Sequence, residues 1–294
     1  MVLHTPRYLQ RITGKNRLKG YDLGSTLVTM KFNGMRLQTI LIFVLMAGLL
    51  MSCSQASRQQ DRNLEFRFNR GQDYFENGKY YKAIEEFKFV VLNNPGGEMA
   101  DDAQLYLADS HFEVGEYVVA ASEYRRLMRR YPESPLVEQA QYKLGMCFVE
   151  LSPHYQLDQD YTRQAITTLQ NFLEQYPNSK YSDKITRQIQ TLRNKLAHKS
   201  YSNGHLYFIL DQYDSALIYY NNLLDQYYDT EWANQARLER AKCLIELGRQ
   251  EEALAQVEEL LTRSPNQDIR VEARRLRDEL RKQVGVAMQG ETGQ

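Results

Sequence analysis

The sequence predicts an all-α fold, a solenoid of about five helical hairpins arranged in two lobes that are joined by a long helix. First, small, aromatic and proline residues recur at fixed positions between Leu64 and about Leu280. Second, the repeats start at residues 64, 101 and 138, and again at 197 and 234, so the spacing within each series is 37. Third, apolar residues follow a helical period through residues 181–210, between the two series. Self-similarity at this period is typical of stacked helical hairpins.

Each repeat has a small residue at position 8, alanine at position 20, large residues at positions 24 and 27, and usually proline at position 32. This is the pattern of the 34-residue tetratricopeptide type. The small residues let the two helices of a hairpin approach closely, and proline ends the second helix because it cannot continue the backbone hydrogen bonding. Repeat one matches throughout, with Gly71, Tyr74, Ala83, Phe87, Val90 and Pro95.

Two repeats depart from this pattern. Repeat three carries eight extra residues around Pro153 to Asp160, which predicts a loop inside that hairpin, and repeat four has Tyr228 where proline is expected. Because about 14 extra residues and the long helix separate Pro177 from repeat four, we expect an N-terminal lobe over 64–180, with repeats one to three. The long helix and repeats four and five form a C-terminal lobe over 181–283. Residues 284–294 have no packing pattern and are expected to be disordered.

The amino terminus is predicted to be a lipoprotein signal. A 12-residue apolar stretch, Ile40 to Met51, follows Lys31 and Arg36 and leads into Ser52-Cys53. It is too short to span a bilayer but fits a secretory signal. The residues before Cys53 look like the lipobox of bacterial lipoproteins, so we expect residues 1–52 to be a leader, Cys53 to carry the lipid and 53–63 to be a tether. Translation is expected to begin at Met30 or Met35, because a start at Met1 would give an unusually long basic lead.

Composition argues against nucleic-acid binding and catalysis. Lysine plus arginine equals aspartate plus glutamate at 37 each, so the chain has no general positive field. No two of the five histidines have zinc-hydrolase spacing, and neither a phosphate-binding loop nor a nucleophile motif is present. We expect no catalytic residue, no metal and no cofactor. Cys147 and Cys243 belong to repeats that are not neighbours, so they are expected to pack in the core without forming a disulfide.

The first helices of the hairpins supply the candidate binding residues. In tetratricopeptide proteins these helices line a concave groove, mainly through positions 2, 5, 9 and 12. The peptide-groove candidates are Phe68, Gln72 and Phe75 in repeat one, Leu105, Asp109 and Phe112 in repeat two, and Tyr142 and Met146 in repeat three. The lysine and asparagine that clamp a terminal carboxylate in chaperone-binding members are absent from repeat one. The alternative is that the aromatic candidates are core residues.

The lipobox, the five repeats, the insertion in repeat three and the long helix together resemble the BamD family of outer-membrane assembly lipoproteins. The most specific segment is QNFLEQYPNSKYSDKITRQIQTLRNKLAHKSY, from Gln170 to Tyr201, which looks like the family's third-repeat Pro-Asn-Ser-x-Tyr segment and following helix. Residues Asn77 to Ile84 resemble its first-repeat turn. The match covers roughly residues 53–283.

The resemblance implies a lipid-anchored protein on the periplasmic face of the outer membrane. Its C-terminal lobe would bind the POTRA-type periplasmic domains of the barrel-forming insertase, and its N-terminal groove would receive the aromatic-ended final strand of unfolded β-barrel proteins. Two other classes remain open. One is an envelope adaptor, such as a cell-division coordinator or a secretin pilot lipoprotein. The other is a carbohydrate-capturing lipoprotein, although such proteins need clustered tryptophans and this chain has only Trp232.

Overall fold

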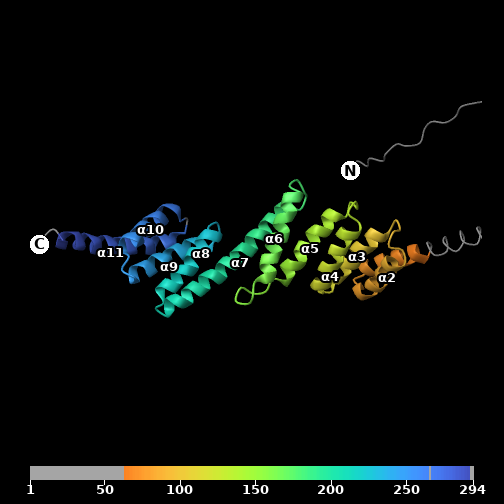
Figure 1. Cartoon of the computed structure of the whole chain (residues 1–294), viewed down its shortest axis with the longest axis horizontal. Coiled ribbons are helices and arrows are strands. Elements are labelled where there is room, and N and C mark those ends of the chain that lie inside the picture. Colours follow the sequence, from red (N-terminus) through yellow and green to blue (C-terminus); the bar gives the residue numbers. More distant parts are fainter. Residues whose placement is uncertain (1–62, 265, 292–294) are drawn as a thin grey trace, which may run out of the picture. The chain divides into compact units, whose positions relative to one another are not determined.

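The protein is described by a computed structural model over residues 63–264 and 266–291, and these residues belong to one compact unit. All regular structure in them is helical (Figure 1). A helix over residues 63–76 is followed by α2 (Tyr80–Asn93), α3 (Ala100–Glu113), α4 (Tyr117–Arg130), α5 (Val137–Leu151), α6 (Asp160–Gln175), α7 (Ser182–Ile209), α8 (Tyr213–Gln226), α9 (Trp232–Glu246), α10 (Gln250–Arg263) and α11 (Gln267–Glu291). The predicted leader, Cys53 and the tether up to residue 62 lie outside the described residues.

The hairpin repeat predicted from the sequence is confirmed. Helix α4 begins 37 residues after α2, α5 begins 37 after α3, and α10 begins 37 after α8. Helices that are adjacent in the sequence pack against one another, from α2 on α3 to α10 on α11. The loop predicted in repeat three lies between Leu151 and Asp160, and the predicted long helix is α7.

Close approach within each hairpin explains why position 8 is small. A Cβ atom on Gly71 would lie 2.8 Å from the Phe87 ring, and one on Gly204 would lie 2.7 Å from the Tyr220 ring. Phe87 and Tyr220 are the residues at position 24 of the same repeats, and both are fully buried. The small residue of the first helix therefore makes room for the large residue of the second, as the pattern predicted.

The turn between the two helices of a hairpin needs a left-handed backbone. Gly78, Gly115 and Gly248 have φ angles of 69°, 82° and 74°, as glycine readily allows. In the fourth hairpin the same place is taken by Asp211, with φ of 57°. Aspartate tolerates this region better than most residues, and its carboxylate accepts a 2.7 Å hydrogen bond from the Tyr213 hydroxyl.

Helix α7 belongs to two hydrophobic clusters. Ile185, Ile189 and Leu192 in its first half pack with the residues of α3 to α6. From Ala197 onward it packs instead with α8 to α11. The two lobes are therefore successive parts of one solenoid whose cores share a single helix.

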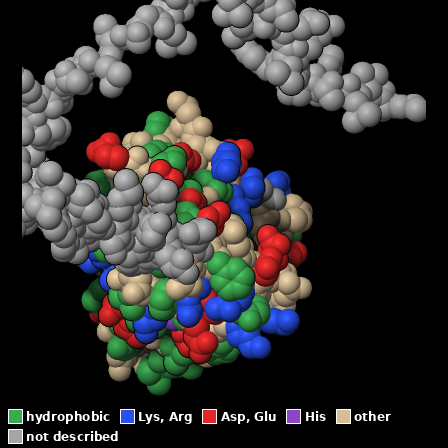
Figure 2. All heavy atoms as spheres, turned by 90° about the vertical axis from the view of Figure 1, so that its right-hand side faces the viewer, with side chains coloured by type: hydrophobic (Ala, Val, Ile, Leu, Met, Phe, Trp, Pro, Cys, Tyr) green, Lys and Arg blue, Asp and Glu red, His purple; other side chains and the backbone are tan. Residues whose placement is uncertain are grey.

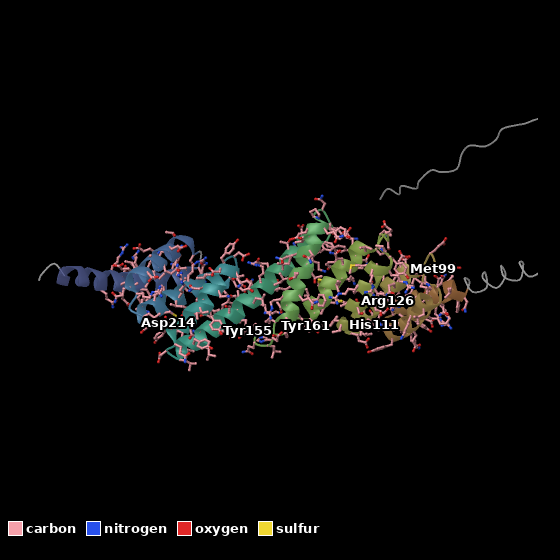
Figure 3. The ribbon with its side chains drawn as sticks, viewed as in Figure 1. Met99, His111, Arg126, Tyr155, Tyr161 and Asp214 are labelled. Carbon is pink, nitrogen blue, oxygen red and sulfur yellow. The ribbon has the colours of Figure 1, made fainter. Side chains whose placement is uncertain are left out.

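The loop of repeat three is fixed to α7 by stacking and by two lysines. Tyr155, labelled in Figure 3, stacks on His198 with ring centroids 3.7 Å apart, and His198 stacks on Trp232 of α9 at 4.0 Å. The ammonium of Lys195 donates to the Ser152 hydroxyl at 2.7 Å, and that of Lys199 donates to the Leu157 carbonyl at 2.5 Å. This loop therefore connects the N-terminal lobe to both α7 and α9.

The stacked histidine predicts a pH dependence. Burial, and then the nearby His154, lower the pKa of His198, while Glu231 acts in the opposite direction. A lowered pKa in the folded protein means that the unfolded chain binds more protons, so stability should fall as the pH drops below about 6.5. The fluorescence of Trp232, the single tryptophan, should report the same titration, since a protonated imidazole quenches a stacked indole. In His198→Gln this fluorescence step should disappear; an unchanged step would mean that His198 is not its source.

Two further predictions can be compared with the structure. Helix α11 extends to Glu291, into the segment from residue 284 that was expected to be disordered. The glycines there do not interrupt the helix, because glycine weakens a helix by only about 1 kcal/mol relative to alanine. Cys147 and Cys243 are buried and unbonded, as predicted, and burial raises the pKa of each thiol to about 12.

Candidate functional site

The peptide-groove candidates lie on the first helices of repeats one to three, which are the helix over residues 63–76, α3 and α5. Phe68 and Phe75 of repeat one both contact Tyr106 of repeat two. Their ring centroids lie 6.0 Å and 5.5 Å from the Tyr106 centroid. Figure 2 views this end of the described helices and shows hydrophobic side chains at the surface among charged side chains of both signs. The candidates divide into an interior set and a partly accessible set.

Four of the candidates belong to the interior. Phe68, Leu105, Asp109 and Tyr142 are all buried. Phe68, Leu105 and Tyr142 are at position 5 of their repeats, and this position packs toward the next hairpin. Tyr142, for example, stacks on Tyr181 with centroids 4.1 Å apart. For these residues the core alternative holds, and they support the surface rather than form it.

The other four candidates keep part of their surface. Gln72, Phe75, Phe112 and Met146 are only partly buried. Phe75 packs edge-on against Tyr80 at 5.4 Å, and Phe112 packs edge-on against Tyr117 at 5.2 Å. Rings fixed by an aromatic neighbour give up little conformational freedom on binding, so Phe75 and Phe112 can serve as rigid apolar contacts.

Lys143 of α5 joins this surface and was not among the sequence candidates. Its ammonium lies 3.4 Å from the Asp109 carboxylate and 5.2 Å from the centre of the Phe112 ring. Its side chain keeps 26% of its surface exposed, whereas the Asp109 side chain keeps 11%. Lys143 is at position 6 of repeat three. A charged residue between two groove positions is the signal that could have identified it.

A hydrogen bond holds Asp109 in place. The Tyr124 hydroxyl donates to the Asp109 carboxylate from α4. Burial, and then the charge of Asp109, raise the pKa of Tyr124, so the hydroxyl stays protonated and remains a donor. The same carboxylate oxygen, Oδ1 of Asp109, contacts both the Tyr124 hydroxyl and the Lys143 ammonium, which holds the lysine beside the Phe112 ring. The group of Phe112, Asp109 and Lys143 offers an aromatic face beside a partly accessible cation.

The described residues contain no set of histidine, cysteine, aspartate or glutamate side chains that could hold a metal ion. In the same part of the chain, no helix combines the length and apolar character needed to cross a bilayer. The fold defines a tetratricopeptide-type repeat protein.

The family follows from comparison with known proteins. The family model described as "YfiO: Outer membrane lipoprotein" matches residues 60–260, which is more than half of the chain. The chain therefore belongs to the YfiO family of outer membrane lipoproteins, as the sequence resemblance indicated, and it is a non-enzymatic scaffold.

Curated relatives agree with this assignment. The outer membrane protein assembly factor BamD of Caulobacter vibrioides is 24% identical over 215 residues, covering 71% of this chain and 70% of the relative. BamD of Rickettsia prowazekii is 24% identical over 222 residues, covering 74% and 88%. Among solved structures, the complex of the TPR2AB domain of yeast Sti1 with an Hsp90 peptide aligns over 75% of this chain and 84% of its own, at 16% identity and a TM-score of 0.41.

Proposed function

We propose that this chain is a scaffold subunit of the machinery that inserts β-barrel proteins into the outer membrane. In this proposal the N-terminal lobe receives unfolded β-barrel substrates, and the C-terminal lobe binds the POTRA-type periplasmic domains of the insertase. Family membership and the names of the two curated relatives support the assignment. The observation that carries the substrate assignment is the Phe112, Asp109 and Lys143 group.

The chemistry of that group suits the end of a β-barrel protein whose last residue is aromatic. An aromatic side chain of the ligand can pack on Phe75 and Phe112, which are already held by Tyr80 and Tyr117. The Lys143 ammonium, partly exposed beside Phe112, can pair with the terminal carboxylate. Asp109 keeps the lysine from leaving this position when no ligand is bound.

A separate surface in the C-terminal lobe supports insertase binding. Leu206, Ile209 and Leu210 at the end of α7 are each more than half exposed. Their spacing places them on one face of the helix. Beside this face, Tyr207 stacks on Tyr219 of α8 at 5.3 Å. Exposed aliphatic and aromatic groups gathered in this way are typical of protein-binding surfaces.

The substrate surface can be tested with a double substitution. Phe75→Ala with Phe112→Ala should weaken binding of a C-terminal β-barrel peptide by about 2 kcal/mol or more, because it removes two rigid apolar contacts. Isothermal calorimetry measures this affinity, and a melting curve shows whether the lobe stays folded. If the folded double variant bound the peptide normally, the assignment of this surface would be wrong.

A matched change in the C-terminal lobe provides the control. Leu206→Ser with Ile209→Ser should reduce capture of the insertase periplasmic domains and leave peptide affinity unchanged. The two double variants should thus lose one function each. Loss of both functions in either variant would indicate a general structural effect instead of two separate surfaces.

The anchor remains a prediction, since Cys53 lies outside the described residues. Cys53→Ala should abolish lipid attachment and leave the protein as an unprocessed precursor that is absent from the outer membrane fraction. Membrane fractionation together with intact mass measures both effects. A wild-type protein without lipid, or one lipidated at another residue, would contradict the prediction.

A further inference from the structure

The solvent-facing side of α4 has an unusual composition. One face of the helix carries Val118, Val119, Ser122, Arg125, Arg126, Arg129 and Arg130, all exposed or partly exposed, and we call this set the α4 outer face. The partly exposed Glu123 borders it. At 3.6 residues per turn the residues of this face occupy an arc about 140° wide. Two exposed valines lie toward the start of the helix and four arginines toward its end, and no acidic residue lies within the arc.

Most of this positive charge is not neutralised by the protein. Glu123, at the edge of the arc, lies 3.6 Å from Arg126 (labelled in Figure 3), and the Arg125 guanidinium lies 5.2 Å from the centre of the Phe148 ring. Within the described residues no carboxylate forms an ion pair with Arg129 or Arg130. The hollow between α2 and α4 extends the face and is lined by Ile84, Lys88, Val91, Leu92, Leu107, His111, Val119, Glu123 and Arg126.

The opposite charge gathers on another helix. The outer side of α10, in the C-terminal lobe, carries Glu251, Glu252, Glu258 and Glu259. Two of these glutamates are paired within the protein, Glu252 with Arg249 at 2.7 Å and Glu258 with Arg281 at 2.6 Å. An anionic surface would therefore be attracted to the α4 outer face and not to the outer side of α10.

We propose that the α4 outer face binds the anionic phospholipid headgroups of the membrane that carries this lipoprotein. Guanidinium groups match phosphate geometry with two parallel donors, and exposed valines can enter the boundary between headgroups and acyl chains. Lipid attachment combined with a basic patch is a common way to fix a protein on a membrane. The face is separate from the surfaces proposed for substrate and insertase, so the inference goes beyond the proposed function.

The predicted anchor makes this contact geometrically possible. Cys53 precedes Asn63, the first described helical residue, by ten residues. Ten extended residues reach about 35 Å at most, so the N-terminal lobe stays close to the headgroup layer. A face that combines valine and arginine also suits a membrane better than a folded acidic protein. The valines can be buried at the lipid boundary, whereas a purely charged protein surface would bury little of their apolar area.

Proximity of a fluorophore to the membrane tests the proposal. Full-length lipidated protein carrying Ser122→Cys is labelled and reconstituted into vesicles that contain a headgroup-attached quencher. The vesicles are made of phosphatidylcholine alone or mixed with phosphatidylglycerol. Cys147 and Cys243 are buried, so the exposed new thiol should be labelled selectively. Ala255→Cys, on the exposed side of α10, is the matched control.

The proposal predicts several-fold stronger quenching at residue 122 than at residue 255 in anionic vesicles. The difference should shrink in neutral vesicles, at high salt, and when Arg125, Arg129 and Arg130 are all changed to Gln. Equal quenching at the two sites, or quenching at residue 122 that does not depend on lipid charge or salt, would overturn it. The salt series uses the native arginines, so it decides the question even if the substituted protein folds poorly.

Discussion

Phe172→Ala is expected to lower the free energy of unfolding by about 3 to 5 kcal/mol, the largest effect of any substitution discussed for this protein. Phe172 is fully buried on α6, at 0% exposure. Its ring lies 5.1 Å from Tyr176, 6.3 Å from Tyr181 and 6.4 Å from Tyr142, measured between ring centres. Removing the ring opens a cavity that these large rings cannot close, because Tyr142 is held within α5 and Tyr176 and Tyr181 are held at the ends of α6 and α7.

Urea denaturation followed by circular dichroism measures this loss. Tyr81→Ala is the matched control, since Tyr81 is an aromatic residue on the outer side of α2 and is 66% exposed. Tyr81→Ala should change the free energy of unfolding by no more than about 0.5 kcal/mol. Comparable losses in the two variants would mean that the middle cluster is not packed as described.

Gly145→Leu is expected to destabilise the N-terminal lobe by about 1 to 3 kcal/mol through overpacking. A Cβ atom on Gly145 would lie 2.5 Å from Cδ2 of Leu169 and 3.1 Å from its Cγ, so a leucine here forces Leu169 out of its position or the helices α5 and α6 apart. Gly71→Leu should act in the same way against Phe87. Both losses outweigh the gain of about 1 kcal/mol that replacing glycine gives inside a helix.

Thermal and urea denaturation of Gly145→Leu, Gly71→Leu and a control decide this point. Gly96→Leu is the control, because nothing lies within 4 Å of a Cβ at that position and its φ is not left-handed. The control should be close to neutral. Near-neutral behaviour of Gly145→Leu would show that position 8 does not face position 24 and that the repeat register is wrong.

Most of the fold could be predicted because its signals are local. Gly71 with Phe87, and Gly204 with Tyr220, are steric pairs separated by one hairpin turn, so their spacing in the sequence already specifies how the two helices meet. The long helix α7 was predictable for a similar reason, since its apolar residues follow one period across the junction between the lobes. The turn at Asp211 was not, because aspartate adopts left-handed backbone less often than glycine and does not mark a turn by itself.

The binding surface was only partly predictable. Repeat positions identify which helix a residue occupies, but whether the side chain stays accessible depends on the neighbouring hairpin. Phe68 and Phe75 are on the same helix, yet Phe68 is buried and Phe75 keeps part of its surface. Lys143 was missed because its role depends on Asp109 and Phe112 of another repeat, a contact that one sequence does not encode directly.

The central claim is that this lipoprotein joins unfolded β-barrel proteins to their insertase. Crosslinking in intact cells, followed by purification of the full-length lipidated chain and mass spectrometry, tests it most directly. We expect the POTRA-type domains of the insertase to crosslink near Leu206 and Ile209, and the C-terminal strands of β-barrel proteins near Phe112 and Lys143. Recovery of cell-division proteins, a secretin or polysaccharide in place of both partners would contradict the account.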